Sequence, residues 1–235
     1  MLKYQQIAAN IEENIYKNDL QQGTKLPTVE NFAAEYNVSK STIVKALESL
    51  VSKGLVYQVQ GSGIFVRRRN HNGYINISLP TGFTNTLKES KITSKVLDCR
   101  IIKPNEEIAK YIECSLDDDI YEVKRIRYID GKIICYEDTY YKKSIVPYLS
   151  KEIAQNSIYE YLKTALNITA GFFDRYLHVG TVGKALSDIL ELDSNSPALT
   201  AYDQAYLPSG VIFNYSRITY HYKHAQFYLQ TSTIK

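Results

Sequence analysis

Several features that would place a chain of 235 residues in a familiar class are scarce or missing here. Only three cysteines occur, Cys99, Cys114 and Cys135, too few and too far apart for a zinc site or a disulfide framework. Each has apolar neighbours, so we expect buried, reduced thiols. No apolar run approaches the roughly 18 residues of a membrane span, and the charged, amphipathic N-terminus does not resemble a signal peptide. These absences favour a cytoplasmic protein without a membrane partner.

Signatures of catalysis and metal binding are scarce as well. No Ser/His/Asp or Cys/His set stands out, and Gly61-Ser62-Gly63 is neither a P-loop nor a GxGxxG motif. His221 and His224 lie three residues apart in a stretch expected to be a strand, which would place them on opposite faces. We therefore predict no catalytic residues, no metal site, no cofactor and no enzymatic activity.

The net charge is small, but its distribution is uneven. The chain has 28 Lys+Arg and 25 Asp+Glu, a formal net charge of +3. Nine of these bases and six of these acids lie in residues 1–70, so 9 − 6 = +3 and the whole excess is there. Such a distribution favours a polyanionic partner for the first third of the chain, with chance as the alternative.

The first third has the pattern of three short helices. Apolar residues recur at spacings of three and four over residues 4–17, which indicates an amphipathic helix. Thr28 suits the N-cap of a second helix, and Ser39 that of a third. We expect the inner stripe of the third helix to be formed by four apolar residues, with Ile43 near its edge. They are Val44, Leu47, Leu50 and Val51.

Two short helices joined by a tight turn at Asn37 are typical of a helix-turn-helix, whose second helix enters the major groove N-terminal end first. That end carries hydroxyls and lysines, which can contact phosphates and base edges. Residues 55–69 then predict a glycine-tipped hairpin, or wing. The candidate DNA-binding residues are Thr28, Ser39, Lys40, Ser41, Thr42, Lys45, Gln60, Gly61, Ser62 and Gly63.

The remainder of the chain predicts a second domain. Residues 68–75 lack an apolar pattern and are interpreted as a linker before a domain over 76–235. Alternating runs predict at least five strands, mostly antiparallel, with Asp130-Gly131 as the strongest hairpin signal. Short helices are expected between them, one opening after Gly82 and one capped at Asn156-Ser157. The fold class is therefore α+β.

A pair of arginines on one of these strands is the clearest candidate ligand site. Arg125 and Arg127 are two residues apart and so point to the same side of a strand. Two guanidinium groups on one face suit a phosphate or carboxylate, although a solvent-facing pair is the alternative. A buried tyrosine needs a hydrogen-bond partner in any case, so tyrosines here can equally belong to the core. Neighbouring strands could add Glu137, Tyr140, Arg217 and Tyr220.

The segments YQQIAANIEENI, QGTKLPTVENFA, VSKSTIVKALESLVSKGLV and QGSGIFV together resemble the DNA-binding domain of the GntR family of bacterial transcription regulators. Residues 75–230, with DIYEVKRIRYIDG, CYEDTYY and GVIFNYSRITYHYKHAQFYL, resemble the UTRA domain. That domain is the effector-binding half of the HutC subfamily, and its fold is like chorismate lyase. The resemblance implies a winged helix-turn-helix over 1–67 and a UTRA domain over 76–235.

The resemblance also implies a function. It implies a bacterial cytoplasmic repressor, a homodimer that binds a palindromic double-stranded DNA operator under the control of a small anionic effector, for which we expect a phosphorylated sugar. A lyase-like enzyme and a DNA-binding dimer without an effector are the alternatives. The implied effector-binding residues are Phe83, Thr84, Arg125, Arg127, Glu137, Ser157, Tyr159, Asn214 and Tyr220.

Overall fold

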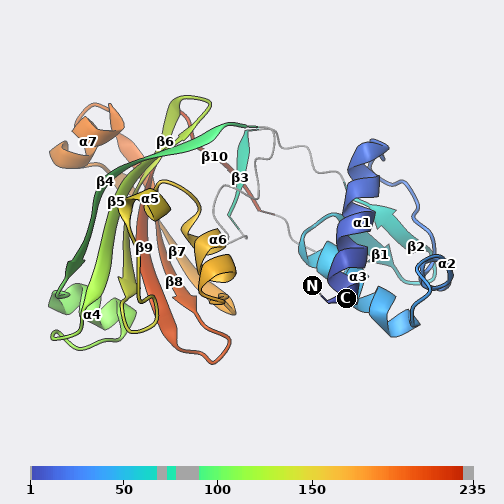
Figure 1. The fold of residues 1–235 in the computed structure, drawn as a ribbon. Helices are drawn as coiled ribbons and strands as arrows, with labels where there is room; N and C mark the ends of the chain where they lie inside the picture. The colour runs from blue at the N-terminus through green and yellow to red at the C-terminus, as the bar shows by residue number, and fades with distance from the viewer. Residues whose placement is uncertain (1, 68–72, 78–89, 230–235) are drawn as a thin grey trace. The chain divides into compact units, whose positions relative to one another are not determined.

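The computed structural model describes residues 2–67, 73–77 and 90–229 and separates into two compact units (Figure 1). The first unit is built on residues 1–71 and the second on residues 72–229. Tyr74 and Ile75, which the sequence analysis assigned to the linker, lie in strand β3 of the second unit. In the described part of the chain, no helix is long and apolar enough to cross a membrane.

The first unit contains three helices and a hairpin, as predicted. Thr28 Oγ1 accepts a hydrogen bond from the backbone N–H of Asn31 at 3.2 Å, and Ser39 Oγ accepts one from Thr42 at 3.4 Å. Both predicted N-caps are therefore confirmed, because each hydroxyl satisfies a backbone donor that the first helical turn leaves free. The elements are α1 (Lys3–Lys17), α2 (Val29–Glu35), α3 (Lys40–Ser52), β1 (Val56–Val59) and β2 (Gly63–Val66).

The inner face of α3 differs from the prediction by a rotation of about one residue. Ile43 is completely buried, whereas Val44 and Val51 are 39% and 36% exposed. Periodicity alone could not choose between two adjacent β-branched residues, since both fit an apolar stripe. Packing against α1 and the base of the hairpin turns Ile43 inward and leaves Val44 on the exposed side. The helix buries Ile43, Ala46, Leu47 and Leu50.

The second unit is built on a six-stranded sheet with the order β4-β5-β6-β9-β8-β7. All neighbouring strands in this sheet are antiparallel, which confirms the predicted antiparallel sheet and α+β class. The strands are β4 (Ile92–Ile102), β5 (Ile120–Ile129), β6 (Lys132–Lys142), β7 (Phe172–Thr181), β8 (Pro197–Tyr206) and β9 (Ile212–His221). Two short strands, β3 (Tyr74–Asn76) and β10 (Gln226–Tyr228), pair in parallel beside it.

The turn between β5 and β6 has the predicted form. Asp130 and Gly131 have φ angles of +50° and +80°. Positive φ at both central residues is the type I′ geometry, whose twist matches that of the flanking strands. The turn pairs Ile129 with Lys132, and a bulge between Arg127 and Tyr128 then shifts the register by one residue, so that Arg125 lies opposite Glu137.

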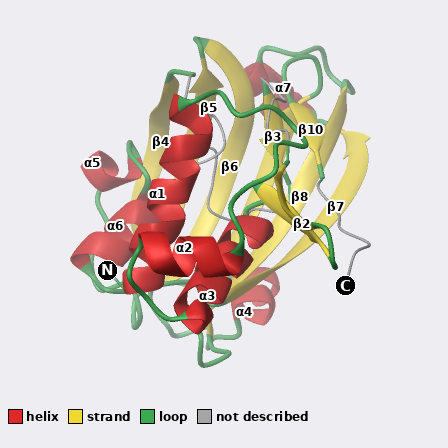
Figure 2. Cartoon of the chain, turned by 90° about the vertical axis from the view of Figure 1, so that its right-hand side faces the viewer, coloured by secondary structure: helices red, strands yellow, loops and turns green. Residues whose placement is uncertain are grey.

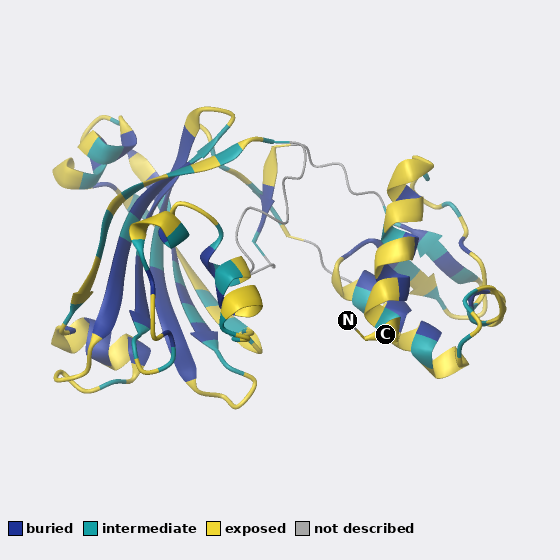
Figure 3. Ribbon diagram, viewed as in Figure 1, coloured by how far each residue is buried: buried dark blue, intermediate teal, exposed yellow. Residues whose placement is uncertain are grey.

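Helices lie against the sheet (Figure 2), and the packing of adjacent residues of one strand shows that they cover both of its faces. Tyr141 packs in one cluster with residues of α5 and α6, whereas Tyr140 packs in another with residues of α4. The α7 side chains Leu186 and Leu190 pack on the same side as α4, against Tyr136. The buried strand centres form the middle of the unit (Figure 3). These helices are α4 (Glu106–Ile112), α5 (Lys151–Ala154), α6 (Ile158–Ala165) and α7 (Lys184–Leu190).

Candidate nucleic-acid interface and ligand site

The first turn of α3 presents a cluster of hydroxyl groups. Ser39 Oγ lies 2.9 Å from both Ser41 Oγ and Thr42 Oγ1. Ser39 and Ser41 are exposed and Thr42 is half-buried. A helix N-terminus carries partial positive charge and unpaired N–H groups, so hydroxyls gathered there suit contact with a DNA phosphate or base edge.

Two lysines lie on the same helix with different surroundings. Lys40 Nζ forms an ion pair of 2.7 Å with Glu30 of α2, and both side chains are more than 60% exposed. The hydrogen bond from Lys40 lowers the pKa of Glu30, so this carboxylate is anionic at neutral pH. Lys45 is exposed and takes part in no ion pair with a described residue. Lys45 is therefore available to a DNA phosphate, whereas Lys40 must first leave Glu30 before it can bind one.

Val44 is a residue of this surface that sequence reasoning missed, because the apolar pattern placed it inside. It lies three residues after Ser41 and next to Lys45, on the exposed side of α3. An exposed apolar side chain among hydroxyls and lysines suits contact with the methyl group of a thymine in the major groove.

The wing carries the predicted glycine tip. Gln60, Gly61 and Ser62 are exposed between β1 and β2, and Gly61 and Gly63 have φ angles of +75° and +126°. A Cβ on Gly63 would lie 2.9 Å from Cε of Lys25. Lys25 was not singled out from the sequence, where it is one more lysine in a turn, yet the fold places its positive charge beside the wing.

Arg125 and Arg127 share one face of the sheet, as predicted, and both are buried, so the solvent-facing alternative is wrong. The guanidinium Nε of Arg125 contacts the carboxylate of Glu137, its register partner on β6. Its Nη1 also donates to the carbonyl oxygens of Ala154 at 2.8 Å and Asn156 at 3.1 Å. Arg125 thus links β5 and β6 to the segment between α5 and α6.

Burial and charge act against each other in this cluster. Burial, together with the neighbouring charge of Arg125, lowers the pKa of Arg127. Burial alone would raise the pKa of Glu137, but the positive charges of Arg125 and Arg127 hold it below its ordinary value. One carboxylate therefore faces two guanidinium groups, and positive charge dominates the cluster.

Three further candidates lie on α6 or on the strand that α6 contacts. Ser157 Oγ accepts from the backbone N–H of Glu160 at 3.3 Å and caps α6, as predicted. Tyr159 donates from its hydroxyl to Oδ1 of the fully buried Asn214 at 2.9 Å. The Nδ2 of Asn214 donates to the carbonyl oxygen of Tyr140 at 2.9 Å. The amide of Asn214 is thus engaged within the protein on both sides.

Tyr220 is buried on β9 and packs edge-to-face against Phe227 of β10, with ring centroids 4.7 Å apart. Burial raises its pKa well above the ordinary value, so its hydroxyl stays neutral. Tyr220 lies opposite Cys135, which is itself the register partner of Arg127. Tyr220 and Arg127 therefore lie on the same face of adjoining strands.

A second, partly buried ion pair on this face was missed. Arg175 of β7 binds Asp203 of β8 through two hydrogen bonds of 2.7 and 2.5 Å, and its Nη1 donates to the carbonyl of Ile77 at 2.9 Å. A cavity of about 340 Å³ lies beside it, lined partly by Tyr159, Lys163 and Phe173. The sequence signal was a lone arginine in the alternating run FFDRYLHVG, which does not reveal its partner.

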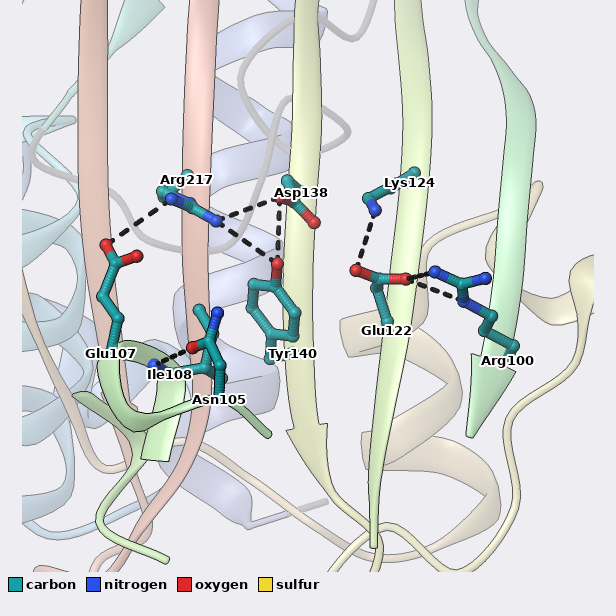
Figure 4. Close-up of polar contacts among 9 residues, drawn as sticks. All are labelled: Arg100, Asn105, Glu107, Ile108, Glu122, Lys124, Asp138, Tyr140 and Arg217. Atoms are coloured by element: carbon teal, nitrogen blue, oxygen red, sulfur yellow. Dashed lines mark hydrogen bonds and ion pairs between the residues drawn. The ribbon is translucent and has the colours of Figure 1, made fainter. Parts of the chain in front are cut away.

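Two expected members of this site lie elsewhere. Tyr140 and Arg217 are on the opposite face, where Arg217 contacts Asp138, Glu107 and the hydroxyl of Tyr140 (Figure 4). Each is three residues from a residue of the site face, Glu137 or Tyr220, and an odd spacing in a strand reverses the side. Phe83, Thr84 and the helix expected after Gly82 lie outside the described residues.

The histidine and cysteine expectations need correction. His221 ends β9, and the chain turns before His224, so their rings stack with centroids 3.8 Å apart instead of lying on opposite faces. Cys135 is buried as predicted, but Cys99 and Cys114 are half-buried. Burial raises the pKa of all three thiols, so they are protonated at neutral pH.

Comparison with known families identifies both parts of the chain. Residues 3–66 match the family described as bacterial regulatory proteins, gntR family, and residues 88–226 match the UTRA domain. The chain is 45% identical over 233 residues to YydK of Bacillus subtilis, an uncharacterized HTH-type transcriptional regulator. That alignment covers 99% of each chain.

Structural comparison gives the same result. A crystal structure of YydK from B. subtilis, described as a possible transcriptional regulator, superimposes with a TM-score of 0.86 at 44% identity. It covers 99% of this chain and 100% of that one. A more distant relative is the mannosyl-D-glycerate transport/metabolism system repressor MngR of Escherichia coli, 27% identical over 91% of this chain and 89% of that protein.

Proposed function

Because the chain belongs to the GntR family of bacterial regulatory proteins and is a DNA-binding transcription regulator with a UTRA domain, we propose that it represses transcription from a palindromic operator under the control of a small anionic effector. The protein works in the cytoplasm, where its operator is. It acts as a homodimer, since two-fold symmetry lets two recognition helices contact two half-sites about one helical turn apart.

One observation carries the effector proposal: among the described residues, the sheet face under α5 and α6 bears more guanidinium groups than carboxylates. Arg125 and Arg127 are buried and Arg175 is half-buried, and they face two buried carboxylates, those of Glu137 and Asp203. Removing charged groups from water is costly, so an unbalanced cluster favours a ligand that supplies the missing negative charge. A phosphate or carboxylate on a sugar has this chemistry, and a phosphorylated sugar is our choice.

The proposed DNA contacts are the hydroxyls of Thr28, Ser39, Ser41 and Thr42, the cations of Lys40 and Lys45, and the wing tip at residues 60–63. They lie at the N-cap of α2, at the N-cap and in the first half of α3, and on the hairpin. The effector must bind the DNA-competent and DNA-incompetent arrangements with different affinities, because only then does it shift the equilibrium between them.

A ligand screen followed by an operator assay tests this function. Thermal unfolding would be measured with sugar phosphates, glycosylated glycerates and the matching neutral sugars. We expect an anionic member to raise the melting temperature and to release a fluorescent operator, and its uncharged analogue to do neither. Stabilisation by neutral sugars alone would contradict the anionic effector. Operator binding without any ligand response would favour a DNA-binding dimer that senses nothing.

The related lyase fold makes an enzyme the rival function. The relatives are transcription regulators, and we propose that this chain has no catalytic activity. An assay of pyruvate release from chorismate checks this directly, and turnover above the uncatalysed rate would overturn the proposal.

A further inference from the structure

The wing of the first unit has a third strand-like segment at residues 24–26. The backbone N–H of Leu26 donates to the carbonyl oxygen of Ile64 on β2 at 2.8 Å, and Lys25 and Phe65 form an antiparallel bridge. This segment therefore runs beside β2, with Lys25 directly opposite Phe65.

The outer face of the wing carries Lys25 and two aromatic rings. Ile64 and Val66 of β2 point into the core of the first unit, so Phe65 between them points outward. Residues directly opposite in antiparallel strands share one face, and Tyr57 accordingly stacks on Phe65 with ring centroids 5.5 Å apart. Lys25 lies on the same face, on the other side of Phe65, and it is exposed.

Gly63 shows which way the side chain of Lys25 runs. A Cβ on Gly63 would lie 2.9 Å from Cε and 3.6 Å from Nζ of Lys25. Gly63 is two residues from Phe65 in the direction of the exposed tip at residues 60–62. The stem of Lys25 therefore starts at the level of Phe65 and crosses the bare backbone of Gly63, so its ammonium group lies near the tip of the wing.

The ammonium group of Lys25 is available for a ligand. Lys40 on α3 is held by Glu30. Lys25, by contrast, takes part in no ion pair within the part of the chain that the structure describes. Lysine is cationic at neutral pH. A positive charge held beside an exposed glycine tip, without an ion-pair partner there, suits a phosphate group.

We propose that Lys25 binds a backbone phosphate of the DNA beside the wing, and that Gly63 is a positioning residue whose missing side chain lets the Lys25 stem reach the tip. The contact extends the DNA-binding surface beyond α3 and the glycine tip to a segment that precedes both helices of the helix-turn-helix. A lysine binds a phosphate as a point charge and reads no base, so this contact positions the wing and adds affinity without choosing a sequence.

The first test measures this phosphate contact by the salt dependence of DNA binding. Fluorescence anisotropy compares the wild type with Lys25→Ala on an operator selected from random DNA and on a scrambled duplex of the same composition. Losing one phosphate contact lowers the slope of log K against log salt concentration by about 0.9 per bound copy of the chain. The affinity advantage of the wild type over the variant should therefore shrink by about 3.5-fold per copy between about 50 and 200 mM salt, and equally on both duplexes.

Two further variants serve as controls. Lys25→Arg keeps the positive charge and should bind DNA with nearly the wild-type slope. Lys17→Ala removes an exposed lysine at the C-terminal end of α1, on neither α3 nor the wing, and should leave the slope unchanged. An unchanged slope in Lys25→Ala, or an equal change in Lys17→Ala, would overturn the contact. A loss of affinity confined to the selected operator would show that Lys25 reads bases, and it would overturn the phosphate contact as well.

The second test combines Gly63→Ala with Lys25→Ala. A methyl group on Gly63 displaces the stem of Lys25, and it also strains a backbone with a φ of +126°. The strain acts in both backgrounds, whereas the displacement matters only where Lys25 is present. Gly63→Ala should therefore lower the salt slope of the wild type and leave that of the Lys25→Ala variant unchanged. Equal effects of Gly63→Ala on the slope in the two backgrounds would show that Gly63 does not position Lys25.

Discussion

The hydroxyl of Tyr159 on α6 donates a 2.9 Å hydrogen bond to Oδ1 of Asn214 on β9, 55 residues further along the chain. Both residues were candidates for effector binding, and the structure joins them to each other. Asn214 Oδ1 also accepts from Ser216 Oγ at 3.3 Å. The link fixes α6 to the sheet beside the buried arginines. Tyr159 and Asn214 therefore hold the elements around the candidate site in place.

Tyr159→Phe removes this link and should lower the free energy of unfolding by about 1–2 kcal/mol, because a buried acceptor loses one of its donors. Chemical denaturation measures the change. Tyr161→Phe on the same helix is the matched control, since the hydroxyl of Tyr161 bonds the carbonyl of Tyr148 in an exposed position. Equal losses in the two variants would show that burial of the Tyr159 link adds nothing.

Lys40→Ala and Lys45→Ala should each weaken operator binding and reduce the dependence of log K on log salt concentration by about one. Fluorescence anisotropy at several salt concentrations measures both quantities. We expect the larger loss at Lys45, because Lys40 must first separate from Glu30. Lys53→Ala is the control, as Lys53 pairs with Glu12 at the other end of α3. Unchanged slopes in both test variants would remove α3 from the DNA interface.

Val44→Ala should weaken binding to the preferred operator, because it removes the exposed methyl groups that we expect to contact the methyl group of a thymine. The operator is first selected from random DNA with the wild type. Each thymine is then replaced by deoxyuridine, which lacks that methyl. At one position, the replacement should lower the affinity of the wild type for the operator. At that position it should not lower the affinity of the Val44→Ala variant any further. Additive losses at every position would show that Val44 contacts no thymine.

Arg125→Ala should abolish the effector response and lower stability, because Glu137 is left buried without its partner. Breaking a buried ion pair in this way costs about 3–5 kcal/mol. Combining Arg125→Ala with Glu137→Gln should restore part of the stability, since the unpaired charge is removed, but not the response. Denaturation and operator release measure the two effects separately. A folded double variant that still responds to the effector would place the anion site elsewhere.

His221→Gln should make stability less sensitive to pH below neutrality. Burial, with a contribution from the stacked His224, lowers the pKa of His221. The unfolded chain binds this proton near pH 6.5, whereas the folded chain binds it only at lower pH, so stability falls as the pH drops below that value. Above it neither state is protonated at this site. Glu191 and Lys223 also act on the ring.

Thermal unfolding between pH 7.5 and 5.5 compares the wild type with His221→Gln. His178→Gln, at an exposed position on β7, is the control for losing a histidine. The His221 variant should lose less stability over this range than the wild type. Identical pH profiles would show that His221 does not contribute to the pH dependence.

Local structure could be predicted from the sequence wherever one residue type has one strong preference. Thr28, Ser39 and Ser157 cap the helices that follow them because a short hydroxyl side chain satisfies a free backbone amide. Asp130-Gly131 forms its hairpin because both residues tolerate positive φ. These are interactions between near neighbours in the chain, and they do not depend on the remainder of the molecule.

Tertiary structure decided which side of a helix is buried and which residues from distant parts of the chain contact each other. Ile43 and Val44 fit an apolar stripe equally well, and only packing against α1 and the hairpin turned Ile43 inward and Val44 outward. Arg125 was placed on the correct face by its spacing from Arg127, yet its contacts with Glu137 and the α5–α6 segment depend on strand register.

The sequence by itself determined the two folding units, the N-caps, the hairpin and the shared face of the two arginines, because these follow from local preference and strand alternation. Only the tertiary structure decided that Arg175 meets Asp203, that Tyr159 meets Asn214, and which strands are neighbours in the six-stranded sheet. Each of these depends on contacts between segments that are distant in the sequence. Such contacts are set by which strands lie side by side in the folded sheet.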